Sequence, residues 1–136
     1  MNKCVFIVDN TLPIGLIANT CAVLALSLGK NHPELVGHDL HDRDGDLHPG
    51  ITTVVMPILG SAKDSIAAIR RKAKGQASDG LQIIDVSNIA QQTKTYGDYG
   101  GLLKETSSEE LQYFGICLFG PAQLIKSLTG SLPLLR

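Results

Sequence analysis

The chain has 136 residues and a formal net charge of -1, and 43% of its residues are hydrophobic and 18% charged. This is the length of one domain with one core, so we expect a single domain over residues 1–136. The near-neutral charge excludes a general attraction to phosphate backbones, and nucleic acid is therefore not an expected partner. The longest apolar stretch, 20–28, is far below the roughly 20 residues that cross a bilayer, and the first apolar run is too short for an export signal. We expect a cytoplasmic protein with no membrane partner.

The first third of the chain is predicted to contain a strand and a helix. Residues 4–8 form a β-branched and aromatic run, which Asp9-Asn10-Thr11 closes. Residues 14–28 follow with apolar side chains at helical spacing and on almost every other side, which predicts a mostly buried helix. Gly29 and Pro33 stand where a helix is expected to stop. The three cysteines lie in apolar segments without C-x-x-C spacing, which predicts free buried thiols and no cofactor: Cys4, Cys21 and Cys117.

The middle of the chain is predicted to form a hairpin, a strand and an amphipathic helix. Asp44-Gly45 between two extended runs is a strong hairpin signal, because the turn needs a positive φ. Residues 54–59 predict a strand. The run 61–64 resembles a capping box and precedes an amphipathic helix over about 62–74.

The last part of the chain continues the alternation of strands and helices. Strands are predicted at 81–85 and 113–119, with short helical turns over 86–103 and a last helix from Gly120-Pro121 through Ser127. These elements predict an α/β fold in three layers, α/β/α, with a mixed sheet of about four main strands plus an edge hairpin.

Two segments resemble the type-2 peptidyl-tRNA hydrolases. Asp9 is followed at that family's spacing by Gly15, Ile17, Ala18 and Cys21. The run 115–122, with Leu128-Thr129-Gly130 after it, is similar to the family's closing strand, helix and tail. The chain more closely resembles an uncharacterised bacterial domain-of-unknown-function family of this length, grouped structurally beside those hydrolases. The resemblance implies a type-2 peptidyl-tRNA hydrolase-like fold.

Four positions depart from the hydrolase pattern. Leu16 stands where that family has a helix lysine, and Thr20 and Val23 stand where it has a glutamine and a histidine. After Asp85, Ile89 replaces its threonine. A lysine-to-leucine change removes a phosphate-binding charge and a candidate acid or base. The resemblance therefore implies the scaffold without the family's usual site, and peptidyl-tRNA hydrolysis by a rearranged site is kept as an alternative.

A candidate site is predicted where strands end. In open α/β sheets, ligands bind outside the carboxyl ends of strands, near helix N-termini. Strand ends are predicted at Asp9, Asp85 and Gly120. The candidate catalytic residues are Asp9, Asp85 and Ser87, with either aspartate as base or hydrogen-bond acceptor. The candidate ligand-binding residues are Asn10, Asn19, Thr20, Asn88, Tyr96 and Tyr99, the two tyrosines forming a lid. The alternative is that the aspartates cap turns, Asn19 satisfies backbone groups and the tyrosines simply pack.

The predicted hairpin holds a dense group of polar residues. Three of the four histidines, His38, His41 and His48, lie in it with four aspartates. Alternation along a strand places His38 and Asp42 on one face, within reach of His48 across the hairpin, which makes metal binding an alternative to a simply solvated hairpin.

Four hypotheses on function follow from the sequence. The leading one is a small-ligand-binding or weakly hydrolytic protein that uses the strand-end cleft. The others are peptidyl-tRNA hydrolysis, a metal-dependent role for the 38–48 hairpin, and a non-catalytic oligomeric module. The last rests on the apolar first helix, which offers surface to another copy in a homo-oligomer.

Overall fold

The computed structural model describes residues 1–76 and 80–136. Its centre is a four-stranded sheet formed by β1 (Asn2–Asp9), β4 (Ile58–Ser61), β5 (Gln82–Ser87) and β6 (Tyr113–Pro121), in the order β4-β1-β6-β5. β1 is parallel to β4 and antiparallel to β6, and β6 is antiparallel to β5. The predicted mixed sheet of four main strands is therefore confirmed. Because only β6 runs in the opposite direction, the carboxyl ends of β1, β4 and β5 lie at the same side of the sheet.

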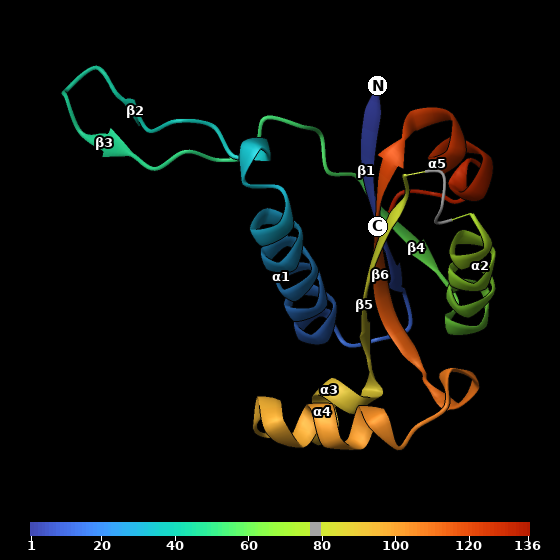
Figure 1. Cartoon of the computed structure of the whole chain (residues 1–136). Coiled ribbons are helices and arrows are strands. Elements are labelled where there is room, and N and C mark those ends of the chain that lie inside the picture. The colour runs from blue at the N-terminus through green and yellow to red at the C-terminus, as the bar shows by residue number, and fades with distance from the viewer. Residues whose placement is uncertain (77–79) are drawn as a thin grey trace.

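Helices cover both faces of this sheet. α1 (Ile14–Asn31) lies on one face, and α2 (Lys63–Gly75) and α5 (Ala122–Thr129) lie on the other (Figure 1). Side chains alternate between the faces, as the pleat requires. Val5 and Ile7 pack in the core half that contains α2, whereas Cys4 and Phe6 pack in the half beneath α1. The molecule thus has three layers, with core on both faces of the sheet.

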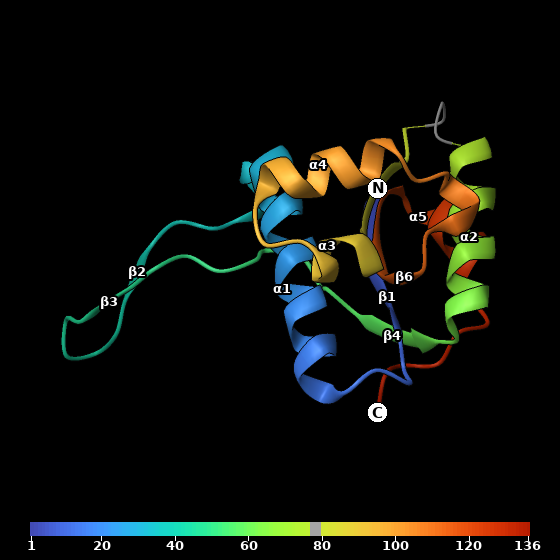
Figure 2. The same cartoon turned by 90° about the horizontal axis from the view of Figure 1, so that it is seen from below.

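Two short helices lie across the strand ends. α3 (Asn88–Gln92) follows β5 directly, and α4 (Tyr96–Lys104) comes after a three-residue link. Seen from below, both lie across the end of the sheet next to α1 (Figure 2). The Thr95 hydroxyl accepts a hydrogen bond from the Asp98 amide at 3.1 Å, which caps α4. Helical structure was predicted over 86–103 and is found at 88–92 and 96–104, whereas Val86 and Ser87 belong to β5.

α1 is less buried than predicted. Only Thr20, Leu24 and Leu28 are buried, while Ile14 and Leu26 are 86% and 78% exposed. The prediction of a mostly buried helix is therefore wrong, since the sheet covers one side of α1 and no described segment covers the other. Within residues 1–76 and 80–136, α1 is also the one helix long and apolar enough, by length and composition, to cross a membrane.

The predicted hairpin forms, although outside the sheet. β2 (Leu40–His41) pairs with β3 (Leu47–His48) in a separate two-stranded ribbon, so the prediction of an edge hairpin of the main sheet is wrong. Residues 36–56 carry this ribbon away from the body as an extended arm, seen in two views (Figures 1 and 2). We call residues 36–56 the arm. A short 3₁₀ turn (Pro33–Leu35) joins α1 to it.

Two local predictions near the arm also need correction. The strand predicted at 54–59 begins only at Ile58, because residues 54–57 bring the chain back from the arm. The capping box predicted at 61–64 does not form, since Ser61 is paired with Asp9 in the sheet and Ala62 stands at the start of α2 without a side-chain cap. A capping box does form at Ser107 and Glu110, around a 3₁₀ turn (Ser108–Glu110).

The C-terminal tail covers one edge of the sheet. The Gly60 amide donates to the Pro133 carbonyl at 3.0 Å, and the Leu135 amide donates to the Ile58 carbonyl at 2.9 Å. Leu134 thereby bridges Leu59 on β4. The β4 edge is occupied, whereas β5 at the other edge pairs with β6 alone among the described strands.

The buried thiols give a first testable prediction. Cys4 and Cys117 are buried on neighbouring strands with their Sγ atoms 3.8 Å apart, and contact with Cys4 together with burial raises the pKa of Cys117. Burial also raises the pKa of Cys21, which is half-buried. Because the thiolate is the reactive form, we expect at most one thiol of the native protein to react with Ellman's reagent at pH 8, and all three after unfolding. Rapid reaction of two thiols in the native state would contradict the burial of the pair.

Candidate functional site

Two of the three predicted strand ends, those of β1 and β5, lie at the same side of the sheet. Asp9, Ser61 and Ser87 are the last residues of β1, β4 and β5. Gly120 lies at the opposite end of the strands, because β6 runs antiparallel to β1 and β5. The prediction that Gly120 lies beside the ends of β1 and β5 is therefore wrong. The side at which β1 and β5 end brings together candidate residues from these two strands.

Asp9 holds the turn between β1 and α1. Its carboxylate is 4% exposed and accepts hydrogen bonds from the Thr11 amide at 2.9 Å and the Thr11 hydroxyl at 2.6 Å. This is the geometry of an aspartate that stabilises its own turn. Asp9 also lines a cavity of about 380 Å³ on the α2 side with Lys63 and Tyr113, and the neighbouring Asn10 is exposed.

The sheet separates several of the predicted residues. Asn19 is exposed on α1, on the face opposite to the Asp9 cavity. Thr20 is fully buried over Gly115, where a Cβ would come within 2.7 Å of the Thr20 methyl group. Ser87 is also fully buried, and within the described residues neither hydroxyl has a hydrogen-bond partner. Asn88 accepts the Gln112 amide at 3.0 Å and thus joins β5 to β6.

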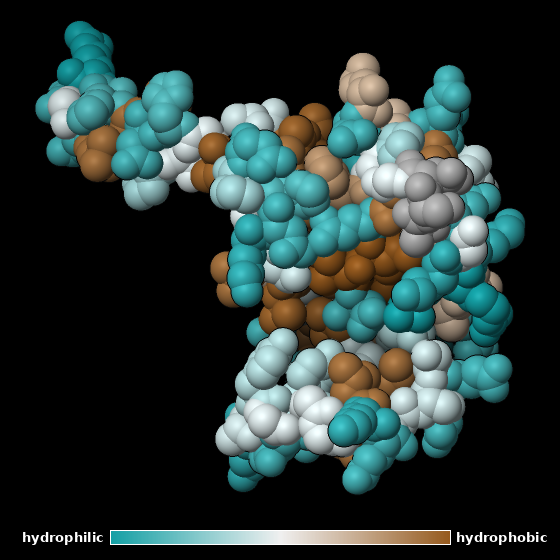
Figure 3. Space-filling view, viewed as in Figure 1, coloured by the Kyte–Doolittle hydropathy of each residue, from teal (hydrophilic) through white to brown (hydrophobic). Residues whose placement is uncertain are grey.

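A cleft beside β5 brings three of the predicted residues together. It lies between α1, β5 and the α3–α4 segment and has a volume of about 450 Å³. In the view of Figure 3, apolar atoms gather in the middle of this face, above the α3–α4 segment. We call it the β5 cleft; its lining is Val23, Ser27, Ile84, Asp85, Val86, Ala90, Thr93, Lys94, Thr95, Tyr96 and Tyr99.

The two tyrosines form the aromatic side of the β5 cleft. Their ring centroids are 5.7 Å apart and the rings are tilted by 51°. Tyr96 is exposed and Tyr99 is half-buried. Burial raises the pKa of Tyr99, with smaller contributions from the Asp85 carboxylate and from Tyr96. The Tyr99 hydroxyl therefore stays protonated at neutral pH and can donate a hydrogen bond.

The Asp85 side chain lies on the face of the sheet that α2 covers, where it meets a basic side chain of that helix. Arg70 Nε lies 3.3 Å from Asp85 Oδ2, and the guanidinium stands 4.8 Å over the Tyr113 ring. Burial is the main cause that raises the pKa of Tyr113. The Asp85 carboxylate is thus paired with a cation, and the charge of Arg70 offsets its own.

Four important residues were absent from the sequence-based site. Ser27, Thr93 and Lys94 line the β5 cleft, and Arg70 holds Asp85. Arg70 follows the buried Ile66 by four residues on α2, so the helical period already placed it on the sheet-facing side. Ser27 likewise follows Val23 by four residues on α1. Thr93 and Lys94 carry no pattern of this kind.

The hairpin histidines form one pair with an aspartate. His48 Nε2 lies 2.8 Å from Asp42 Oδ2, and this contact is the main cause that lowers the pKa of Asp42. The Asp44 and Asp46 amides donate to Asp42 Oδ1, so the same carboxylate closes the turn. Across residues 1–76 and 80–136, no group of three or more His, Cys, Asp or Glu side chains is placed to hold a metal ion. In the hairpin, the contacts of Asp42 therefore stabilise the turn between β2 and β3.

The fold and the cleft define a mixed α/β domain with a binding-sized cavity at an open strand. Residues 2–136 match the family described as "Protein of unknown function (DUF2000)", and the chain belongs to that family. The solved structure of a protein of unknown function, Atu0240 from Agrobacterium tumefaciens strain C58, is similar over 99% of this chain and 98% of that one. The TM-score is 0.90 and the identity 12%. That likeness shows a shared fold. No curated protein matches the chain.

Proposed function

We propose that the protein binds a small, flat, anionic molecule in the β5 cleft. The observation that carries this proposal is the composition of the cleft, in which an aromatic pair and an apolar wall stand beside a lysine. Its volume of about 450 Å³ lies in the range of small-molecule sites, roughly 300–1,000 Å³. The wall is supplied by Val23, Ile84, Val86 and Ala90. Such a lining favours an aromatic ring.

The polar groups of the cleft favour a negative charge on that ring. Lys94 is exposed at the rim and supplies a cation. Tyr99 supplies a hydroxyl donor, and Ser27 lines the cleft from α1. Asp85 is neutralised by Arg70, so it does not repel an anion strongly. The expected ligand class is therefore an aromatic carboxylate or sulfonate.

Binding is favoured over hydrolysis as the function of this cleft. The serine considered as a nucleophile, Ser87, is fully buried, and Asp85 is paired with Arg70. Weak hydrolysis by a cleft residue stays a secondary hypothesis. For peptidyl-tRNA, it is tested by peptide release from charged tRNA and by loss of that release in Asp85→Ala.

The finer fold assignment belongs to the same proposal. We infer a fold of the type-2 peptidyl-tRNA hydrolase kind, on the strength of the 115–122 motif, which forms the end of β6 and the start of α5. The positions at which that family carries polar helix residues are here Leu16, Thr20 and Val23. Val23 lines the β5 cleft. The helix position that carries a histidine in the hydrolases therefore presents an apolar valine to the cleft in this chain. The free thiols of Cys4 and Cys117 support a reducing, cytoplasmic location.

Fluorescence titration with 1-anilinonaphthalene-8-sulfonate tests the binding proposal. This probe is flat, aromatic and anionic, and the chain has no tryptophan to interfere. We expect saturable binding that Tyr99→Ala weakens about three- to tenfold, the value of one aromatic contact of about 0.5–1.5 kcal/mol. Lys94→Ala should weaken it about fivefold, and added benzoate should compete.

A matched control separates the cleft from general apolar binding. Lys104 is exposed at the end of α4, outside the lining of the cleft, so Lys104→Ala should leave binding unchanged. Equal affinities for the native protein, Tyr99→Ala and Lys94→Ala would contradict the proposal and place the probe elsewhere on the surface.

A further inference from the structure

The arm is hydrogen-bonded along its length although it stands clear of the body. At its base, the Thr53 amide and hydroxyl donate to the Leu35 carbonyl at 2.8 and 2.9 Å, and the Gly37 amide donates to the Ile51 carbonyl at 2.9 Å. Farther out, the Gly50 amide donates to Asp39 Oδ1 at 2.9 Å. The tip is closed by Asp42. The arm is therefore a defined structure.

Two glycines bring the limbs of the arm into contact. A Cβ added to Gly50 would lie 1.7 Å from the Gly37 carbonyl oxygen, well inside any allowed approach. At the tip, Gly45 has a φ of 90°, which L side chains rarely adopt. Glycine is thus required at Gly50 and favoured at Gly45 for the arm to keep this shape.

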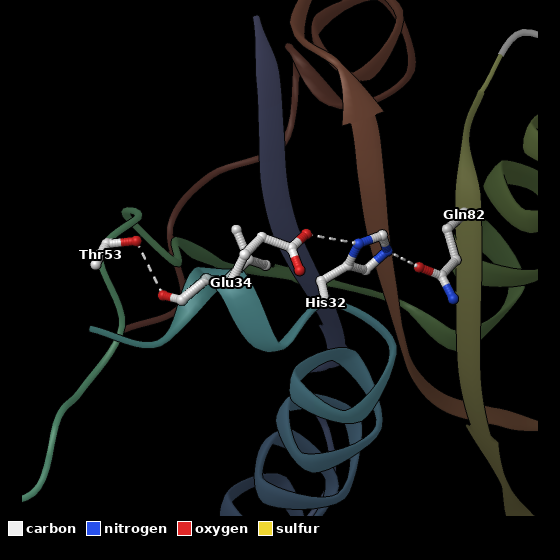
Figure 4. A network of polar contacts seen from close by, with 5 residues as sticks. His32, Glu34, Thr53 and Gln82 are labelled. Atoms are coloured by element: carbon white, nitrogen blue, oxygen red, sulfur yellow. Dashed lines mark hydrogen bonds and ion pairs between the residues drawn. The ribbon is translucent and has the colours of Figure 1, made fainter. Parts of the chain in front are cut away.

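The base of the arm is fixed to the sheet. Figure 4 shows His32, at the end of α1, between Glu34 and Gln82 of β5. Thr53 lies on the other side of Glu34, and its hydroxyl donates to the Leu35 carbonyl. The His32 ring also packs on Phe119 with ring centroids 4.5 Å apart. These contacts set the direction in which the arm leaves the body.

The exposed apolar side chains gather on the arm and on α1. Eight of the eleven large apolar side chains that are exposed in the described residues lie there, so the apolar surface is concentrated on these two neighbouring elements. They are Ile14, Val23 and Leu26 on α1 and Val36, Leu40, Leu47, Ile51 and Val55 on the arm. Ile14, Ala18, Ala22 and Leu26 follow each other at four-residue spacing on the outer side of α1. A concentration of this kind marks an interaction surface.

We propose that this surface joins two copies of the chain in a homodimer, in which the outer sides of the two α1 helices meet and each arm lies along the partner copy. A two-fold interface requires a surface that is complementary to itself. The outer side of α1 meets this requirement, since the helix carries a single charged residue, Lys30, near its end. Two copies can approach there without like charges in the middle.

Size and charge both support the use of the arm. α1 has 18 residues and is about 27 Å long and ~10 Å wide. Its outer side alone thus falls well short of the ~800 Å² per partner found in stable dimers. Each limb of the arm spans about ten residues, or roughly 30 Å, which matches the length of the helix. The tip holds Asp39, Asp42, Asp44 and Asp46 against one arginine, so two arm tips repel and each favours the body of the partner.

The oligomeric state in solution tests this proposal. By analytical ultracentrifugation, we expect the wild-type chain to have twice its 14.5 kDa mass at micromolar concentration. Ala22→Asp places a charge on the outer side of α1, and Leu47→Asp places one on the arm. Each should raise the dimer Kd at least tenfold. Gln123→Asp, at an exposed position of α5, is the matched control and should leave the dimer unchanged.

A shortened arm gives a second, independent measurement. Replacing residues 38–49 with a Gly-Ser pair removes the ribbon without touching the core, so the variant should keep its circular dichroism spectrum and unfold cooperatively as a monomer. A wild-type chain that is monomeric at 100 μM, or a dimer that survives either Ala22→Asp or the shortened arm, overturns the proposal. So does binding of monomeric wild-type chain to phosphatidylcholine vesicles that Ala22→Asp abolishes, which would assign the surface of α1 to a membrane.

Discussion

Ile116→Ala will destabilise the protein by about 3–4 kcal/mol, within the range of 2–5 kcal/mol found for large-to-small changes at buried sites. Ile116 is fully buried in the middle of β6, opposite Ile7 on β1 and Asp85 on β5. Its side chain fills the core half that contains α2 and α5. Removing it leaves a cavity between a rigid sheet and two helices, where little relaxation is possible. For a chain of this size the loss corresponds to a melting temperature lower by about 10–15 °C.

Urea unfolding followed by circular dichroism measures this effect. Leu134→Ala is the matched control, because Leu134 is 53% exposed in the tail and its backbone bridge to Leu59 does not need the side chain. We expect less than about 1 kcal/mol for the control. Similar losses in the two variants would contradict a core centred on β6.

Arg70→Ala will destabilise the protein by about 1–3 kcal/mol. Breaking a buried ion pair costs more than this, but the two side chains are 19% and 24% exposed, so solvent screens part of the interaction. The variant also loses the contact of the guanidinium with the Tyr113 ring. Arg71→Ala, at an exposed neighbouring position, should cost less than about 0.5 kcal/mol.

A double-mutant cycle isolates the pair. The free energy of unfolding is measured for Arg70→Ala, for Asp85→Asn and for the two changes together. We expect a coupling of about 1 kcal/mol or more, since each single change leaves its partner without the contact. A coupling near zero would mean that Asp85 and Arg70 act independently, and the argument that Asp85 is neutralised at the β5 cleft would then fail.

The sequence predicted the main elements of the fold because their signals are local. Short apolar runs predicted the strands β1, β5 and β6, and Asp44-Gly45 predicted the turn between β2 and β3. The burial of α1 was mispredicted for a physical reason. Apolar residues on every side of a helix indicate which side chains are more stable out of water. Their burial also depends on whether another part of the protein packs on the side of the helix that faces away from the sheet. The projecting arm depends in the same way on contacts beyond its own residues.

The candidate site was predictable only in part. Asp85, Tyr96 and Tyr99 lie together at the β5 cleft, whereas Asp9 lies on the other side of the sheet from Asn19. The strand-end rule predicts at which end of the strands a site forms. It does not predict on which face of the sheet each side chain lies, because that depends on the alternation of side chains along the strand and on which of them contact the core. Asp9 follows Val5 and Ile7 at two-residue spacing, so its face was already implied once those residues were known to contact α2.

The C-terminal tail has a consequence for how the sheet can associate. It fills the β4 edge through the backbone bonds at Gly60 and Leu135, and within the described four-stranded sheet β5 is then the one strand that retains a free row of backbone donors and acceptors. Strand addition at the four-stranded sheet can therefore join two molecules at most, with β5 paired to β5, and then has no further edge of that sheet to use. A chain built in this way is protected against fibrillar growth, and that protection depends on its last few residues.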